Sequence, residues 1–191
     1  DPDKAHELLV GGLLAFYQQL YLYQQNMASY RPYNIEKPLW VLLGTSVSAF
    51  YTKGGKRYSD VAEIIAFLDR FTKDRFWAME IINRILKGNS GFKDSESGQD
   101  LFAPYITYLR SLDANEIYNC ILSEIFHGSG GLEIWEIKQA DGELGLRLSV
   151  ASNEQPYFGV INIGDVSTFK GYLSKHLGIE VQEDNFHTSL F

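Results

Sequence analysis

A long helix is predicted over residues 3–30, because apolar side chains recur there every three or four positions. They are Leu9, Leu13, Phe16, Leu20 and Tyr23. The Gly11-Gly12 pair lies inside this pattern, and within a helix such a pair indicates close packing or a bend. We interpret Tyr17, Tyr21 and Tyr23 as packing residues rather than as a ligand cage.

Half of a βαβ unit is predicted after this helix. Residues 39–44 are continuously apolar and end in a glycine, which is typical of a strand buried on both faces of a parallel sheet. Residues 52–57 then form a basic loop, and residues 59–71 return to helical spacing. Asp60 and Glu63 lie three positions apart at the start of that helix, as in a capping box. Strand, loop and capped helix together indicate an α/β fold.

The remainder of the chain alternates between helix and strand patterns. Residues 114–126 are predicted as a helix with Asp113 as its N-cap. Residues 132–150 are predicted as a β-hairpin, because Asp141-Gly142 is a strong signal for a two-residue turn and the residues after it alternate in polarity. The other predicted elements are helices at 76–86, 101–112 and 165–176, a buried strand at 156–164 and a short strand at 179–181.

The predicted architecture is an α/β fold in which a partial parallel sheet carries a helical insertion and a β-hairpin. We expect residues 39–44 and 158–163 to be neighbouring parallel strands, with the helix at 59–71 packed on their sheet. The helical block up to residue 128 should lie to one side of it. The predicted divisions are a helical lead-in at 1–38, a sheet domain formed by 39–72 and 156–191, a helical insertion at 73–131 and the hairpin at 132–155.

The charge pattern argues against strong nucleic-acid binding by the chain as a whole. Its formal net charge is −7, and affinity for a phosphate backbone comes from Lys and Arg. Residues 31–57 are the exception, because they contain five basic residues and Glu36 as their one acid. The chain also has 12 Tyr, 12 Phe and 3 Trp, more rings than a domain of this size easily buries, so some are expected at an interface.

Candidate chemistry is scarce. The chain contains no GxxxxGK[ST] phosphate loop. Its histidines are scattered along the sequence: His6, His127, His176 and His187. Glu133 and Glu136 should point to opposite faces of a strand, so they are not an acid–base pair. The single cysteine, Cys120, excludes an internal disulfide, and no stretch is long enough to span a membrane. We therefore expect a cytoplasmic chain, and its first and last residues look like an excerpt from a longer protein.

Three segments, taken in order, resemble one known family. They are residues 34–47 (NIEKPLWVLLGTSV) with 59–71 (SDVAEIIAFLDRF), then 145–148 (GLRL), then 156–165 (PYFGVINIGD) running to 189–191 (SLF). Together they resemble the DEAD/DEAH-box (superfamily 2) helicases related to the Res subunit of type III restriction enzymes. The resemblance implies that the chain opens the second RecA-like motor domain. ATP and Mg²⁺ would belong to the parent protein, whose phosphate-binding lysine would precede Asp1 and whose arginine motif would follow Phe191.

The same resemblance implies where nucleic acid would bind. Gly44, Thr45 and Ser46 would lie at a strand end that faces the nucleic-acid backbone, although an ordinary strand-ending turn explains them equally well. Strand-end loops of open α/β sheets do bind ligands, and hydroxyl and N–H groups suit phosphates. The basic residues of the following loop would add electrostatic contacts, unless that loop is merely solvated: Lys53, Lys56 and Arg57.

Two functions follow from these observations. The first is a fragment of an ATP-dependent helicase or translocase that acts on DNA in restriction or phage defence, with the remaining motor domains as its partners. The second is a non-catalytic interaction module whose aromatic-rich helices dock a partner protein. The two are distinguished by whether the reading frame extends on both sides, with a phosphate-binding loop upstream and an arginine motif downstream.

We predict that the chain alone hydrolyses no ATP, because it has no lysine loop to position the phosphates and their metal. The measurement is steady-state phosphate release by the purified chain with ATP, Mg²⁺ and DNA. Activity that survives dialysis and exceeds the contaminant level would contradict this prediction.

Overall fold

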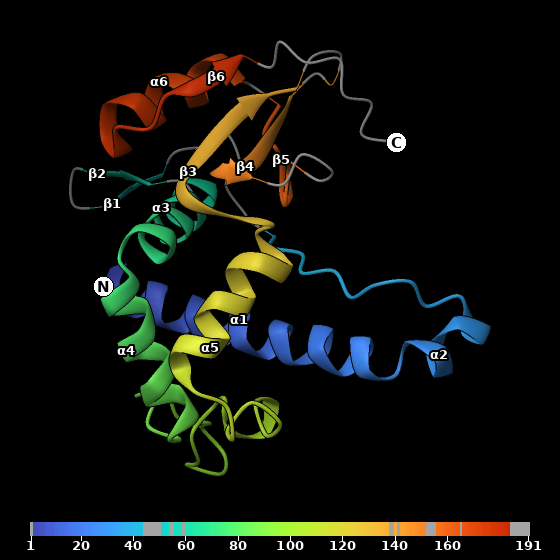
Figure 1. The fold of residues 1–191 in the computed structure, drawn as a ribbon. Helices are drawn as coiled ribbons and strands as arrows, with labels where there is room; N and C mark the ends of the chain where they lie inside the picture. The colour runs from blue at the N-terminus through green and yellow to red at the C-terminus, as the bar shows by residue number, and fades with distance from the viewer. Residues whose placement is uncertain are drawn as a thin grey trace. The chain divides into compact units, whose positions relative to one another are not determined.

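The computed structural model describes residues 2–43, 51–53, 56–58, 60–137, 140, 142–151, 156–164 and 166–183. The chain divides into two compact units, each made of two segments. Unit 1 comprises Asp1–Leu42 and Asp74–Ile121, and unit 2 comprises Leu43–Lys73 and Leu122–Phe191. Unit 1 is helical and unit 2 contains the sheet (Figure 1). The predicted α/β class is therefore confirmed.

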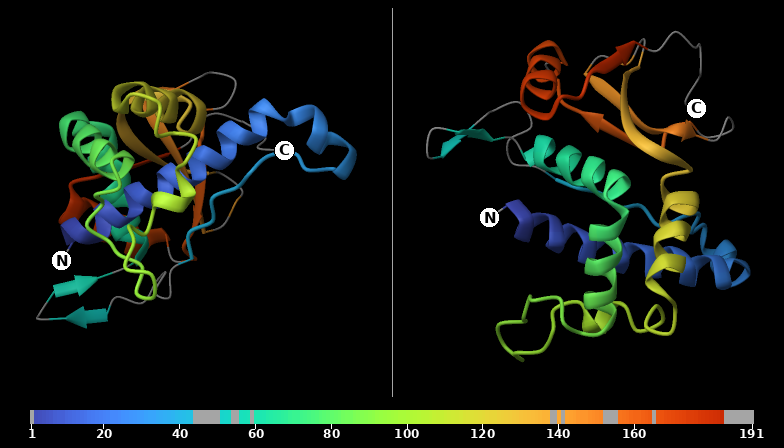
Figure 2. Two further views of the ribbon diagram at one scale, coloured as in Figure 1. Left: turned by 90° about the horizontal axis from the view of Figure 1, so that it is seen from below. Right: turned by 60° about the vertical axis from the view of Figure 1, so that its left-hand side comes forward.

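Unit 1 is built on one long helix. Helix α1 (Pro2–Gln25) ends at Asn26 and is followed by α2 (Met27–Tyr30) and a 3₁₀ turn (Arg31–Tyr33), so the predicted helix is confirmed with a break near its end. Helix α4 (Arg75–Leu86) packs on α1, and α5 (Ala114–Cys120) packs on α4. The segments that the sequence separated as lead-in and insertion thus share one core (Figure 2).

Close packing explains the glycine pair in α1. A Cβ atom placed on Gly11 would overlap the ring of Phe102, which is buried against the helix backbone. A Cβ atom on Gly12 would meet only Trp40, at the ordinary contact distance of 3.6 Å. Helix α1 continues through both positions. The pair therefore serves a close approach at Gly11 rather than a bend.

Unit 2 is organised around a four-stranded mixed sheet with the order β5-β4-β3-β6. Strands β3 (Gly128–Glu136) and β4 (Glu143–Ala151) form the predicted hairpin, and β5 (Gly159–Asn162) pairs antiparallel with β4. Helix α6 (Val166–Leu177) then returns the chain to β6 (Val181–Glu183), which pairs parallel with β3. Opposed residues on one face of the hairpin are buried: Leu132 and Leu148, and Ile134 and Leu146.

Helix α3 (Asp60–Lys73) packs on β3, as predicted for the helix at 59–71. Phenylalanine rings join this helix to the sheet region, and two of them, Phe71 and Phe126, are buried. The Phe71 ring lies edge-on to Phe126 at 6.0 Å, and Phe126 lies 4.7 Å from Phe158, between ring centroids. Phe126 follows a single π-helical turn, Ile121–Ile125, which continues from α5. These rings form the aromatic core of unit 2.

The prediction for residues 39–44 was wrong. Residues 39–43 are extended but form no strand, and β5 is paired antiparallel with β4 instead of lying beside them. A continuous apolar run indicates that a segment favours burial but does not specify its hydrogen-bonding partner. Here Trp40 stacks on Phe16 of α1, with ring centroids 5.9 Å apart, and this contact places the segment along the helix.

The helix predicted at residues 101–112 is also absent. Only a 3₁₀ turn (Ala103–Tyr105) forms, with Pro104 inside it. Proline removes one helical N–H donor. The backbone N–H of Tyr108 instead donates to Gln18 Oε1 of α1, at 2.8 Å. Buried Ile106 and Leu109 therefore anchor an irregular segment rather than one face of a helix.

The glycine pair generates a test with an internal control. Gly11→Ala should destabilise the chain by about 1–3 kcal/mol, because overpacking displaces the Phe102 ring. Gly12→Ala should instead stabilise it by up to about 1 kcal/mol, since alanine favours the helix. In a Phe102→Ala background the Gly11→Ala penalty should disappear. Urea unfolding followed by circular dichroism measures all four variants, and a penalty for Gly11→Ala that persists in that background would refute the packing explanation.

Candidate nucleic-acid interface

The predicted interface residues fall into two groups. Gly44, Thr45 and Ser46 lie outside the described residues. Lys53, Lys56 and Arg57 lie on a short antiparallel hairpin, in which β1 (Tyr51–Lys53) pairs with β2 (Lys56–Tyr58). The segment expected to be an irregular loop is thus a hairpin at its described positions, and it extends away from the sheet in Figure 2 (right).

The register of this hairpin concentrates positive charge. Lys53 is opposite Lys56, and Thr52 is opposite Arg57. Like charges directly opposite each other across a strand pair are destabilising. Phosphate groups are the anions that lysine and arginine bind in nucleic acids. The described backbone therefore brings the three predicted cations together on one element.

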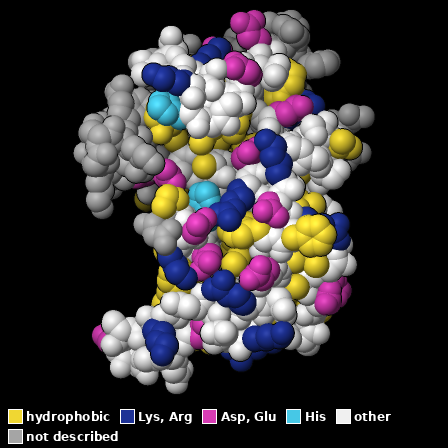
Figure 3. Space-filling model, turned by 90° about the vertical axis from the view of Figure 1, so that its left-hand side faces the viewer, with side chains coloured by type: hydrophobic (Ala, Val, Ile, Leu, Met, Phe, Trp, Pro, Cys, Tyr) yellow, Lys and Arg dark blue, Asp and Glu magenta, His cyan; other side chains and the backbone are white. Residues whose placement is uncertain are grey.

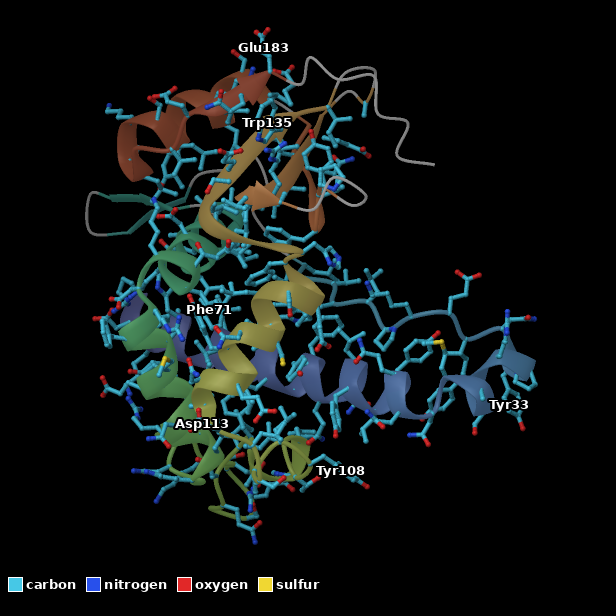
Figure 4. The ribbon with its side chains drawn as sticks, viewed as in Figure 1. Tyr33, Phe71, Tyr108, Asp113, Trp135 and Glu183 are labelled. Atoms are coloured by element: carbon cyan, nitrogen blue, oxygen red, sulfur yellow. The ribbon has the colours of Figure 1, made fainter. Side chains whose placement is uncertain are left out.

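A second polar cluster, which the sequence did not reveal, lies on β3 and β4. Glu133 is opposite Arg147, and Arg147 Nε lies 3.2 Å from Glu133 Oε2. The guanidinium carbon of Arg147 lies 4.8 Å from the ring centroid of Trp135, whose Nε1 donates to Glu133 Oε2 at 3.1 Å. Figure 4 labels Trp135 on the sheet. Because Glu133 is paired with Arg147 and accepts a hydrogen bond from Trp135, we interpret its role as structural rather than as that of an acid or base.

Glu136 has a different partner, the ammonium group of Lys170 on α6. The expectation that Glu133 and Glu136 are not an acid–base pair is therefore consistent with their separate partners. Both Glu133 and Glu136 are half-buried and paired, so neither is a freely solvated charge. Only the strand register could have revealed the pairing of Glu133 with Arg147.

Unit 1 contains a third network, which ties a loop to two helices. Arg84 of α4 donates to Glu7 of α1 and, at 3.0 Å, to the carbonyl oxygen of Ser90. Lys4 also binds Glu7, at 3.0 Å. Burial acts to raise the pKa of Glu7, but the hydrogen bonds and charges of Lys4 and Arg84 outweigh it and hold that pKa below its usual value of 4.5.

The same loop is held at its far end by Asp100. Its carboxylate accepts from the Ser90 N–H at 2.7 Å and from the Phe102 N–H at 3.0 Å. Burial acts to raise the pKa of Asp100, and the hydrogen bonds from Ser90, Phe102 and Ala103 lower it overall. This network positions Phe102 against Gly11, so its role is structural.

Three further kinds of functional feature concern the described residues: a metal site, a membrane span and a basic surface. Among the described residues, no group of three or more His, Cys, Asp or Glu side chains is arranged to hold a metal ion. No helix in the described part of the chain combines the length and apolarity that a membrane span needs. On the face shown in Figure 3, Lys and Arg side chains alternate with Asp and Glu, so the described side chains there build no continuous basic surface.

Comparisons with known proteins yield no match: no family model fits the sequence, and no curated protein or solved structure matches it. The resemblance to helicases therefore stays a prediction from the sequence.

The Glu7 network predicts a pH dependence of stability. A carboxyl whose pKa is lowered by folding stabilises the folded state above its unfolded pKa, and the contribution is lost as pH falls. Stability due to Glu7 should therefore be complete above about pH 5 and decline as pH falls through 4.5 towards the lower folded pKa. Glu7→Gln should flatten this part of the curve of unfolding free energy against pH, measured by urea unfolding. Glu80→Gln, on an exposed position of α4, is the matched control and should not. Equal curves for Glu7→Gln and the parent would contradict the assignment.

Proposed function

We propose that this chain is part of an ATP-dependent DNA helicase or translocase motor and that its β1–β2 hairpin contacts the phosphate backbone. The observation that carries the proposal is the register that sets Lys53 opposite Lys56, with Arg57 beside them on the same hairpin. The chain as a whole is acidic, with a net charge of −7, so a hairpin with three basic residues is a local exception. Binding of an anionic ligand accounts for such a local exception, whereas solubility depends on the net charge of the whole chain.

The motor class rests on the resemblance of residues 34–47, 59–71 and 156–165 to the helicases related to the Res subunit. On this proposal the chain contributes to the second RecA-like domain. The rest of the motor supplies the ATP and Mg²⁺ sites, and restriction or phage defence is the process served. The α/β sheet with helix α3 packed on β3 is compatible with such a role. The hairpin would then add affinity without reading base sequence, because phosphate contacts carry no sequence information.

A second candidate function, a protein-interaction module, is favoured by one specific observation. The extended segment at residues 39–43 exposes large apolar side chains: Leu39 is 82% exposed, Val41 60% and Leu43 91%. Contiguous exposed apolar residues of this kind mark contact surfaces. The two functions are compatible if the surface meets another part of the same motor.

Changing Lys53, Lys56 and Arg57 to Ala together should weaken DNA binding equally for all sequences. With about three phosphate contacts, the parent should show a slope of log affinity against log salt of roughly −2 to −3, and the triple variant should show a slope near zero. The measurement is fluorescence anisotropy of labelled single-stranded and duplex DNA at several salt concentrations.

The matched control removes three exposed cations from unit 1: Lys87, Lys93 and Arg110. It changes the net charge by the same amount, so it separates a local contact from a general charge effect. If both triple variants bind like the parent with the same slope, or if both lose affinity equally, the hairpin is not the nucleic-acid contact and the proposal fails.

A further inference from the structure

An aromatic tip is formed where α1, α2 and the following 3₁₀ turn meet, and we define it as Tyr23, Tyr30 and Tyr33. The rings of Tyr23 and Tyr30 are stacked, with centroids 5.7 Å apart and planes 8° from parallel. Tyr33 is 77% exposed, and Figure 4 shows it at the end of unit 1 formed by α2 and the 3₁₀ turn. Neither Tyr30 nor Tyr33 belongs to the buried core of the unit.

Local backbone geometry produces this arrangement. The N–H of Asn26 donates to the carbonyl oxygen of Tyr23, and the Asn26 side-chain amide donates to that of Leu22, which ends α1. Asn34 has a left-handed conformation, with φ of 54°, and turns the chain back along the helix. The Tyr23 hydroxyl then donates to the carbonyl oxygen of Ile35, at 3.5 Å. The tip is thus a defined structure whose outermost ring faces solvent.

Charge around the tip is unusual for this chain. The segment from Leu8 to Arg57 contains Glu36 as its one acid, although the whole chain has 24 acids against 17 Lys and Arg. Arg31 and Lys37 flank Tyr33 in sequence, both are exposed, and neither forms an ion pair with any residue that the structure describes. Aromatic rings and two exposed cations therefore occur in one short segment, with Glu36 as its one acid.

We propose that the aromatic tip binds single-stranded nucleic acid by stacking its bases on Tyr33 and on the Tyr23–Tyr30 pair, while Arg31 and Lys37 contact the phosphates. The class of ligand rests on the proposed function, and the site is separate from the hairpin. Aromatic platforms combined with cations are the usual means of binding single strands without sequence preference. Bases within a duplex are already stacked on each other, so the tip selects single strands. A protein partner would not require the two cations.

Tyr33→Ala should lower affinity for a labelled single-stranded oligonucleotide by about fivefold or more and leave affinity for the matching duplex unchanged, since each stacked base contributes at least about this factor. Tyr30→Ala should act in the same direction. Tyr33→Phe keeps the ring and should bind like the parent. Tyr108→Ala removes an exposed tyrosine elsewhere in unit 1, labelled in Figure 4, and should have no effect.

The hairpin triple variant of Lys53, Lys56 and Arg57 separates the two sites. If it loses duplex binding while Tyr33→Ala changes nothing, the hairpin proposal stands and the tip proposal is overturned. If the hairpin variant binds normally while Tyr33→Ala loses only single strands, the hairpin fails and the tip stands. A parent that binds neither form overturns both. Concentration-dependent self-association that is abolished by Tyr33→Ala, without any change in DNA affinity, would assign the tip to protein contact and overturn its nucleic-acid role.

Discussion

Strand β3 is hydrogen-bonded along both of its edges, and unit 2 is built around it. Its antiparallel partner β4 buries Leu148 and Leu146 opposite Leu132 and Ile134. Its parallel partner β6 is reached through α6, because parallel neighbours need a crossover connection. Helix α3 covers the same strand.

The absence of a side chain at Gly11 plays the corresponding part in unit 1. It lets the Phe102 ring approach the backbone of α1, and the loop that carries Phe102 is held by Asp100 and Arg84. Glu7, on the first turns of α1, closes this network through Arg84. One position without a Cβ atom therefore sets how closely a long irregular segment can pack. The polar groups that surround it form hydrogen bonds with the loop backbone.

Contact with nucleic acid depends on segments whose charge departs from the average of the chain. The acidic total disfavours general affinity for nucleic acid, so any contact must come from local exceptions. The basic hairpin is one, with cations opposed by its register. The aromatic tip is the other, with Arg31 and Lys37 beside it in sequence and Glu36 as the one nearby acid. Electrostatic contact on one element and base stacking on the other would together suit a chain that holds DNA loosely within a larger motor.

Sequence periodicity by itself determined most helices, because each depends on local hydrogen bonds and a repeating apolar face. The helices around Leu13, Ile65 and Phe169 were predicted close to their observed bounds, and Asp113 accepts from the Asn115 N–H as an N-cap should. The hairpin of β3 and β4 was also predicted. Its register was not: the Glu143 N–H donates to the Ala140 carbonyl oxygen at 3.1 Å, as a turn at Asp141-Gly142 requires, but the strands pair Glu136 with Leu144.

The register of β3 and β4 decides which side chains meet across the two strands, including Glu133 with Arg147. Strand partners, the fate of residues 39–43 and the close approach of Phe102 to Gly11 were likewise settled only by tertiary structure. The candidate cations could be named from their sequence alone, but their opposition on one hairpin and the stacking of Tyr23 on Tyr30 could not. The physical reason is the same in each case. Local patterns specify which residues favour burial or a helix, while pairing and close contact depend on segments far apart in the chain that only the folded state brings together.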